Sequence, residues 1–336
     1  MIQTDGLSPE QIAGQRLIAG FDGTTLNDEL KFLIDGLKVG GLILFKRNII
    51  DAGQTGRLCR DILKYADSCG QPPLFIAVDQ EGGQVARLPD AFTRFPGNPF
   101  ITTPSQAEIF AVSTARDLTG LGINMNMAPV LDVPPFKGDS IMRERAFSHR
   151  PSIVSELGGT VIDAFQHNHI MSVAKHFPGI GRTTLDSHLE RPEFDGDITD
   201  MHSHDLIPFQ TAIEKRVAGI MLSHILYTRI DPKWPASLSS EIADNLLRKR
   251  MGYDGIVMTD DLDMAAITNH YNIQTVVDQI LSAGIDIALI CRKGPHIEIA
   301  FQRILEHLRN GKLPENKWTD PLRRIVDLKR KYLFRG

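Results

Sequence analysis

Eight short apolar runs recur along the chain, and longer stretches with helical periodicity separate them. The runs are rich in Ile, Val, Leu and Met, and several are apolar at every position rather than at every second one. Such runs are typical of parallel strands that are covered on both faces. The predicted strands are Arg16–Phe21, Gly41–Phe45, Leu74–Val78, Asn124–Ala128, Met171–His176, Gly219–Ser223, Gly255–Thr259 and Asp286–Ile290.

Helical periodicity fills the intervals between these runs. An opening helix is indicated by Ser8-Pro9-Glu10-Gln11, which combines a capping-box spacing with proline at the first helical position. A basic helix near Pro321–Tyr332 closes the chain, and its charges are expected on a solvated face. The other predicted helices are Asp28–Leu37, Thr55–Ser68, Gln106–Leu121, Ile153–His167, Asp205–Val217, Glu241–Met251, Ile273–Ala283 and Ile297–Arg309.

Strands that alternate with helices predict an α/β protein with a parallel sheet. The first strand leads into Gly20-Phe21-Asp22-Gly23, which does not match the G-x-G-x-x-G turn of open dinucleotide-binding sheets. A closed (β/α)8 TIM barrel is therefore favoured over an open doubly wound sheet. Such barrels run from roughly 200 to more than 400 residues as one unit. Because no repeat or linker divides the chain, residues 1–336 are expected to form a single domain.

Polar residues follow five of the eight predicted strands. In a TIM barrel the chemistry lies at the C-terminal ends of the strands. One polar residue at such a position is well explained by a structural role, but a ring of them indicates a functional site. The residues at these ends are Asp79, Asp132, Lys175, His176, His224 and Asp260.

Two of the loops that follow strands have an unusual composition. Val78–Arg87 places Asp79, Glu81, two glycines and Arg87 just past a strand, and glycine allows a close approach of backbone to ligand. Lys175–His188 runs through proline and two glycines, and then offers Asp186 two residues before His188. A carboxylate beside an imidazole fixes its tautomer and favours its charged form, which suits a proton donor near neutral pH.

The seventh strand leads into three acids, Asp260, Asp261 and Asp263. Asp260 follows the apolar run directly and is expected to be held rigidly, as a carboxylate nucleophile must be. Asp261 and Asp263 are expected to act as capping or first-turn acids of the next helix.

Composition and the N-terminal sequence limit which class of ligand and which cellular compartment are expected. The chain has 37 lysines and arginines against 41 aspartates and glutamates, a formal net charge of −4 and no basic stripe, so nucleic acid is not an expected partner. The first eight residues lack the segments of a signal peptide, and no apolar run approaches the roughly 20 residues of a membrane helix. Three cysteines without metal-type spacing indicate reduced thiols in a cytoplasmic protein.

These segments, in this order, resemble those of the family 3 glycoside hydrolases, and most of all its single-domain bacterial β-N-acetylglucosaminidases. The combination of K-H-F-P-G…D-S-H with V-D-Q-E-G-G is specific for the family. The likeness extends from about the second strand through the seventh. Further stretches that carry it are Gly41–Asn48, Ala128–Val133, Arg145–Phe147 and Gly255–Asp261.

The resemblance implies a retaining double displacement that needs no metal or organic cofactor. It assigns Asp260 as the nucleophile, His188 as the general acid/base and Asp186 as the partner of His188. The implied substrate is a small carbohydrate with terminal β-linked N-acetylglucosamine, such as a muropeptide from peptidoglycan or an oligosaccharide. The implied sugar-binding residues are Asp79, Arg87, Arg145, Lys175 and His176, with Arg143 as an alternative to Arg145 and with Asp132 and His224 as wall residues.

Two positions depart from the family pattern. Ile180 stands where the family usually has histidine, and Arg182 stands where it often has an acid. Three alternatives remain open. The first is a β-N-acetylglucosaminide phosphorylase or a β-glucosidase of the same family. The second is a metal-dependent barrel hydrolase, for which His167–His169 and His202–His204 have H-x-H spacing but lie near predicted helices. The third is a non-catalytic sugar-binding barrel.

Overall fold

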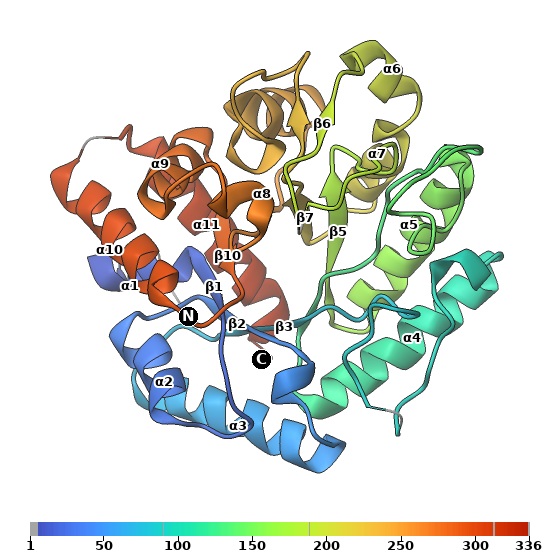
Figure 1. Ribbon diagram of the computed structural model, residues 1–336. Coiled ribbons are helices and arrows are strands. Elements are labelled where there is room, and N and C mark those ends of the chain that lie inside the picture. Colours follow the sequence, from blue (N-terminus) through green and yellow to red (C-terminus); the bar gives the residue numbers. More distant parts are fainter. Residues whose placement is uncertain (1–5, 90, 188, 312, 335–336) are drawn as a thin grey trace.

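The computed structural model describes residues 6–89, 91–187, 189–311 and 313–334. Its centre is a closed barrel of parallel strands in the order β1-β10-β9-β7-β5-β4-β3-β2, with helices around it (Figure 1). The predicted TIM barrel is confirmed, and each predicted run coincides with one barrel strand, although β5 extends one residue and β9 two residues beyond the predicted end. The barrel strands are β1 Leu17–Gly20, β2 Gly41–Leu44, β3 Phe75–Val78, β4 Met125–Asn126, β5 Met171–Phe177, β7 Gly219–Leu222, β9 Ile256–Asp261 and β10 Ile287–Ile290.

Side-chain caps fix where several of the helices begin. Ser8 forms the predicted capping box with Gln11, and Asp51 and Thr103 cap the next long helices through their side-chain oxygens. The α-helices are α1 Pro9–Gln15, α2 Asp28–Lys31, α3 Ala52–Ser68, α4 Pro104–Leu121, α5 Pro151–His167, α6 Ile198–Ser203, α7 Leu206–Glu214, α8 Ala265–Thr268, α9 Ile273–Ala283, α10 Pro295–Asn310 and α11 Asn316–Leu333. Two further segments, Phe32–Gly36 and Glu241–Arg250, are wound as π-helix.

Apolar side chains form two clusters. An inner cluster fills the barrel with residues such as Ile18, Met125 and Met258, and an outer cluster lies between the strands and the surrounding helices. Ile325 and Tyr332 of α11 belong to the inner cluster. Helix α11 therefore closes one end of the barrel.

The prediction of a solvated basic face on this last helix is only partly right. Lys329 is 0% exposed, and its Nζ atom donates to Gln15 Oε1 at 2.5 Å and to the carbonyl of Gly40 at 2.8 Å. Arg324 pairs with the buried Asp286 at 2.9 Å. Because α11 packs across the barrel end, positions that a free helix would expose lie inside the protein.

Two barrel strands carry an extra residue at their C-terminal ends. Between β5 and β7 the register moves from Ala174↔Ile220 to Phe177↔Leu222, so that β5 advances by one residue more than its neighbour. A similar shift separates Ile287↔Met258 from Leu289↔Asp261, between β10 and β9. Such bulges redirect side chains at the rims of barrels.

A two-stranded parallel sheet lies outside the barrel, formed by β6 Glu193–Phe194 and β8 Leu226–Tyr227. It joins the segment after β5 to the segment after β7. Within the described parts of the chain, no helix has the length and apolar character to cross a membrane.

Candidate active site

A small cavity of about 160 Å³ opens at the C-terminal ends of the barrel strands. Seven of the eight predicted site residues line it, and the eighth, His188, lies outside the described residues. Larger cavities occur as well. Two of them measure about 670 and 750 Å³, and the second of these shares Arg87 with the small cavity. The first lies beside Leu74, which precedes β3, and therefore opens at the opposite end of the barrel. The predicted residues that line the small cavity are Asp79, Arg87, Arg145, Lys175, His176, Asp186 and Asp260.

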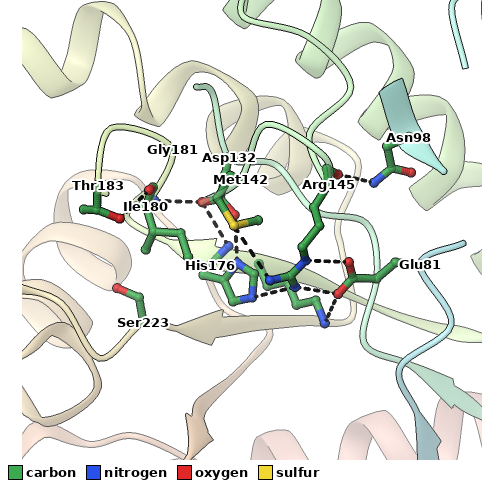
Figure 2. Close-up of polar contacts among 12 residues, drawn as sticks. Glu81, Asn98, Asp132, Met142, Arg145, His176, Ile180, Gly181, Thr183 and Ser223 are labelled. Carbon is green, nitrogen blue, oxygen red and sulfur yellow. Dashed lines mark hydrogen bonds and ion pairs between the residues drawn. The ribbon is translucent and has the colours of Figure 1, made fainter. Parts of the chain in front are cut away.

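Glu81 forms the centre of the charge network in this cavity. It accepts two hydrogen bonds from the guanidinium of Arg145, at 2.7 and 3.0 Å (Figure 2). Its Oε1 also lies 2.7 Å from the ammonium of Lys175. Lys175 also donates to Asp79 at 2.7 Å. Burial alone would raise the pKa of Glu81, but the charges of Lys175 and Arg145 outweigh it and lower that pKa to about 2. Glu81 was not among the predicted site residues, although it is the second acid of the D-Q-E-G-G segment.

Arg87 completes this wall and faces Asp79 at 3.7 Å. Burial would lower the pKa of Lys175, yet Asp79 and Glu81 raise it overall, so the ammonium keeps its charge. Three cations and two carboxylates held this way present both donors and acceptors. This is the chemistry that binds a ring with several hydroxyl groups.

His176 is oriented by Asp132 from behind the cavity. The two side chains meet at 2.7 Å, Nδ1 to Oδ2, and the Nε2 atom of His176 lies 3.4 Å from Arg145 (Figure 2). Asp132 does not line the cavity, and neither does His224, which contacts Ser237 Oγ and the backbone carbonyl of Asp261. The prediction that these two residues form the wall is wrong. Instead they bind groups of the cavity from behind, Asp132 through the ring of His176 and His224 through the backbone of Asp261.

Asp260 and Asp261 both line the cavity at the bulged end of β9. Burial would raise the pKa of Asp260, but the neighbouring imidazoles of His224 and His176 lower it overall. Burial raises the pKa of Asp261 to about 6, against hydrogen bonds from the backbone N–H groups of Asp263 and Cys291. Asp260 is therefore the more acidic of the two carboxyl groups and stays ionised at pH values where Asp261 takes up a proton, and an ionised carboxylate is what a nucleophile requires.

The expected capping role of Asp261 and Asp263 is wrong. Helix α8 begins after Met264 with no side-chain cap. Asp263 instead contacts His296 Nδ1 at 2.7 Å and accepts from the backbone N–H of Arg292 at 2.9 Å. The two acids bind the segment after β10, because the bulge aims them toward that strand rather than along the chain.

Comparison with known proteins places the chain in a family. The model described as Glycosyl hydrolase family 3 N terminal domain matches residues 10–328. The chain belongs to glycoside hydrolase family 3. The family of hydrolytic enzymes expected from the sequence is thereby confirmed.

Two curated relatives and one solved structure show the extent of the similarity. Beta-hexosaminidase A of Pseudoalteromonas piscicida is 36% identical over an alignment of 334 residues, and the match covers 92% of this chain and 56% of that protein. Beta-hexosaminidase of Nitrosomonas eutropha is 35% identical over an alignment of 285 residues, and the match covers 82% of this chain and 80% of that one. A family 3 β-N-acetylglucosaminidase from Paenibacillus sp. str. FPU-7 superposes with a TM-score of 0.95 at 33% identity. That match covers 98% of this chain and 63% of the Paenibacillus chain, so two of these three relatives extend well beyond the matched part.

The structure distinguishes the two arginines that were candidates for sugar binding. Arg145 lines the cavity and binds Glu81. Arg143 is exposed and donates to backbone carbonyls, including that of Pro135 at 3.2 Å. Arg145 is thus the arginine at the cavity, and Arg143 braces its loop.

The H-x-H pairs lie away from this family 3 site. His167 and His169 are at the end of α5, and His202 and His204 are at the end of α6. Among the residues with described positions, no group of three or more His, Cys, Asp or Glu side chains is arranged to hold a metal ion.

Proposed function

We propose that the chain is a retaining exo-β-N-acetylglucosaminidase in which Asp260 forms the covalent glycosyl intermediate. The observation that carries the proposal is the position of Asp260. This ionised carboxylate faces a cavity of about 160 Å³ whose lining also includes all five predicted hydroxyl-binding residues. The cavity is smaller than the roughly 300–1,000 Å³ typical of drug-sized ligands, which suits one terminal sugar. The names of the relatives support an N-acetylhexosamine as that sugar.

In the proposed first step, the imidazolium of His188 protonates the glycosidic oxygen while Asp260 attacks the anomeric carbon. The bond to the leaving oxygen breaks and the aglycone departs as an alcohol. In the second step, neutral His188 takes a proton from water, which displaces Asp260 and releases the sugar. Asp186 lines the same cavity and is proposed to stabilise the charged imidazole.

Asp79, Arg87, Arg145, Lys175 and His176 are proposed to bind the sugar hydroxyls. The proposal calls for no cofactor and treats residues 1–336 as one catalytic domain. A muropeptide from peptidoglycan is proposed as the natural substrate and the cytoplasm as the compartment, on the resemblance and on three cysteines that are all free.

The test compares initial rates of hydrolysis of an aryl β-N-acetylglucosaminide and of the matching aryl β-glucoside. A strong preference for the N-acetyl sugar supports the proposal. Equal rates or a glucoside preference contradict the assigned sugar. Adding inorganic phosphate distinguishes a phosphorylase, which would release a sugar 1-phosphate. Mass spectrometry of the enzyme quenched during turnover should find one N-acetylhexosaminyl group on the peptide that contains Asp260.

A further inference from the structure

Arg182 makes an unusually dense set of contacts at the start of the loop that carries Asp186. Its guanidinium binds Asp205 through two nitrogens, with the Nε contact at 3.3 Å, and binds Asp200 through a third. It also lies over the ring of Phe194, 4.6 Å from the ring centroid. Arg182 therefore links the loop after β5 to helices α6 and α7 and to β6.

The partner of Arg182 is a buried charge. The side chain of Asp205 is only 1% exposed. A buried carboxylate that loses its cation is strongly destabilised. Burial would lower the pKa of Arg182, but hydrogen bonding to Asp205 raises it overall, so the pair remains ionic.

Asp205 touches the loop at a second point. A Cβ atom at Gly179 would lie 2.8 Å from Cβ of Asp205, and Gly179 has a φ of +126° that disfavours other residues. The loop backbone is therefore packed directly on the residue that Arg182 binds. A shift of Asp205 would move both Gly179 and Arg182.

The backbone of residues 179–181 forms hydrogen bonds to three other parts of the protein. Tyr227 donates to the carbonyl of Gly179 at 2.9 Å, Ser140 donates to that of Gly181 at 2.6 Å, and the N–H of Ile180 donates to Asp132 at 2.8 Å (Figure 2 shows the last of these). Asp132 is the residue that orients His176. The start of the loop is thus built into the same scaffold as the sugar-binding cavity.

Asp186 lies only four residues beyond Arg182, a span of at most about 14 Å of extended chain. The loop is held again directly after it, where the carbonyl of Ser187 accepts the N–H of Ala266 at 3.1 Å. Since Ala266 follows closely on Asp260 and Asp261 in the chain, the far end is fixed relative to the nucleophile. The position of Asp186 is therefore set by these two ends of the loop.

We propose that Arg182 is a positioning residue for proton transfer, and that its ion pair with Asp205 aligns the loop so that the acid/base group reaches the glycosidic oxygen. The inference rests on the proposed function. It also accounts for the departure from the family pattern at this position, since an arginine here finds a buried carboxylate to bind.

The test uses aryl and alkyl β-N-acetylglucosaminides that share the sugar and differ in the acidity of the leaving group. Arg182→Gln and Asp205→Asn are compared with wild type by kcat/KM, which reports the step in which the leaving group departs. A 2,4-dinitrophenyl leaving group needs little protonation, whereas a methyl leaving group depends on it. General acid catalysis contributes about 10²–10⁴-fold. We expect kcat/KM to fall by less than about threefold for the dinitrophenyl glycoside and by more than about tenfold for the methyl glycoside.

Three further measurements make the outcome decisive. Arg303→Gln is the matched control, because Arg303 forms a similar two-nitrogen pair with Asp278 at 2.8 Å, away from the cavity. Inhibition by free N-acetylglucosamine reports whether each variant keeps a folded sugar site. Arg182→Lys, which keeps the charge, should recover part of the loss on the methyl glycoside.

An equal loss for all leaving groups, as expected for a merely structural role, would overturn the inference, and so would no loss at all. If Arg182→Gln does not fold, the same pattern is required of Arg182→Lys and Asp205→Asn. Failure of the proposed function is a separate result, because wild type would then show no preference for the N-acetyl sugar.

Discussion

Glu81→Gln removes one negative charge from the centre of the cavity while keeping the size of the side chain. Glu81 is 2% exposed and binds Arg145 and Lys175. Glutamine offers one acceptor oxygen in place of two, and its NH2 group would face the N–H donors of the two cations. The substitution therefore tests whether Glu81 aligns the groups proposed to hold the sugar.

The magnitude follows from the pKa of Glu81. The pKa falls from an ordinary value of 4.5 to about 2 in the folded protein. A lowering of about 2.5 pKa units corresponds to about 3 kcal/mol of stabilisation. Because the folded pKa is the lower one, this stabilisation is fully present above about pH 4.5 and is lost as the pH falls toward 2. The variant should lose about 3 kcal/mol of unfolding free energy at neutral pH, which agrees with the cost of breaking a buried ion pair.

Urea unfolding of wild type and variant measures this difference, at pH 7 and at the lowest pH where wild type still folds. Glu306→Gln is the control, since Glu306 binds Arg303 at 2.7 Å with half of its side chain exposed, and a surface pair contributes less than about 1 kcal/mol. The KM for an aryl β-N-acetylglucosaminide should also rise in Glu81→Gln. A variant as stable as wild type at pH 7, or a difference that does not shrink in acid, would refute the reasoning.

Three other predictions concern single residues. Asp260→Asn should lower kcat on an aryl β-N-acetylglucosaminide by at least about 10⁴-fold, and appreciable turnover would place the nucleophile elsewhere. Burial lowers the pKa of Lys329 well below its ordinary value, so wild-type stability should rise with pH by up to about 1.4 kcal/mol per unit until the unfolded pKa near 10.4 is reached. Lys329→Met should remove this contribution in urea unfolding, and the exposed Lys331→Met should not. Burial and then the charge of Asp261 raise the pKa of Cys291, which leaves it as the unreactive thiol at neutral pH. When the native protein is treated with iodoacetamide at neutral pH, peptide mass spectrometry should therefore find the label at the less buried Cys69 and not at Cys291.

The barrel could be predicted because its strands are short and apolar on both faces. Strand boundaries are harder to predict where side-chain hydrogen bonds replace the pairing between strands. The predicted strand Asn124–Ala128 is observed only at Met125–Asn126. The side-chain amides of Asn124 and Asn126 each donate one hydrogen bond to the backbone around β3 and accept one from it. These bonds replace backbone hydrogen bonds that pairing of two strands would have made. The pattern of apolar and polar residues in the sequence does not predict such hydrogen bonds from side chains.

The missed parts of the site depend on residues far apart in the chain. Glu81 and Arg145 are 64 positions apart, and only the closed barrel brings them to 2.7 Å. Asp132 was expected in the wall, because a strand end looks the same in sequence whether its side chain faces the cavity or lies behind it. A composition of D-Q-E-G-G indicates a functional loop, but the partner of each acid is decided by packing.

The bulges explain why adjacent polar residues at a strand end both reach the cavity. Along β5, Met171 and Val173 belong to the inner cluster and Ala174 to the outer one, so strict alternation would send Lys175 inward and His176 outward. Instead Phe177 belongs to the outer cluster, which means that the extra residue has turned His176 inward beside Lys175.

The same reasoning applies to β9, where Met258 is inner and Leu262 is outer, so that Asp260 and Asp261 both face the cavity. Without the bulge, one acid of this pair would lie among apolar side chains between strands and helices, where an unpaired charge is very costly. Two consecutive ionisable residues at the end of an apolar strand therefore indicate more than a site. They also indicate a bulge, because in a regular strand only one of two consecutive side chains can face the polar cavity.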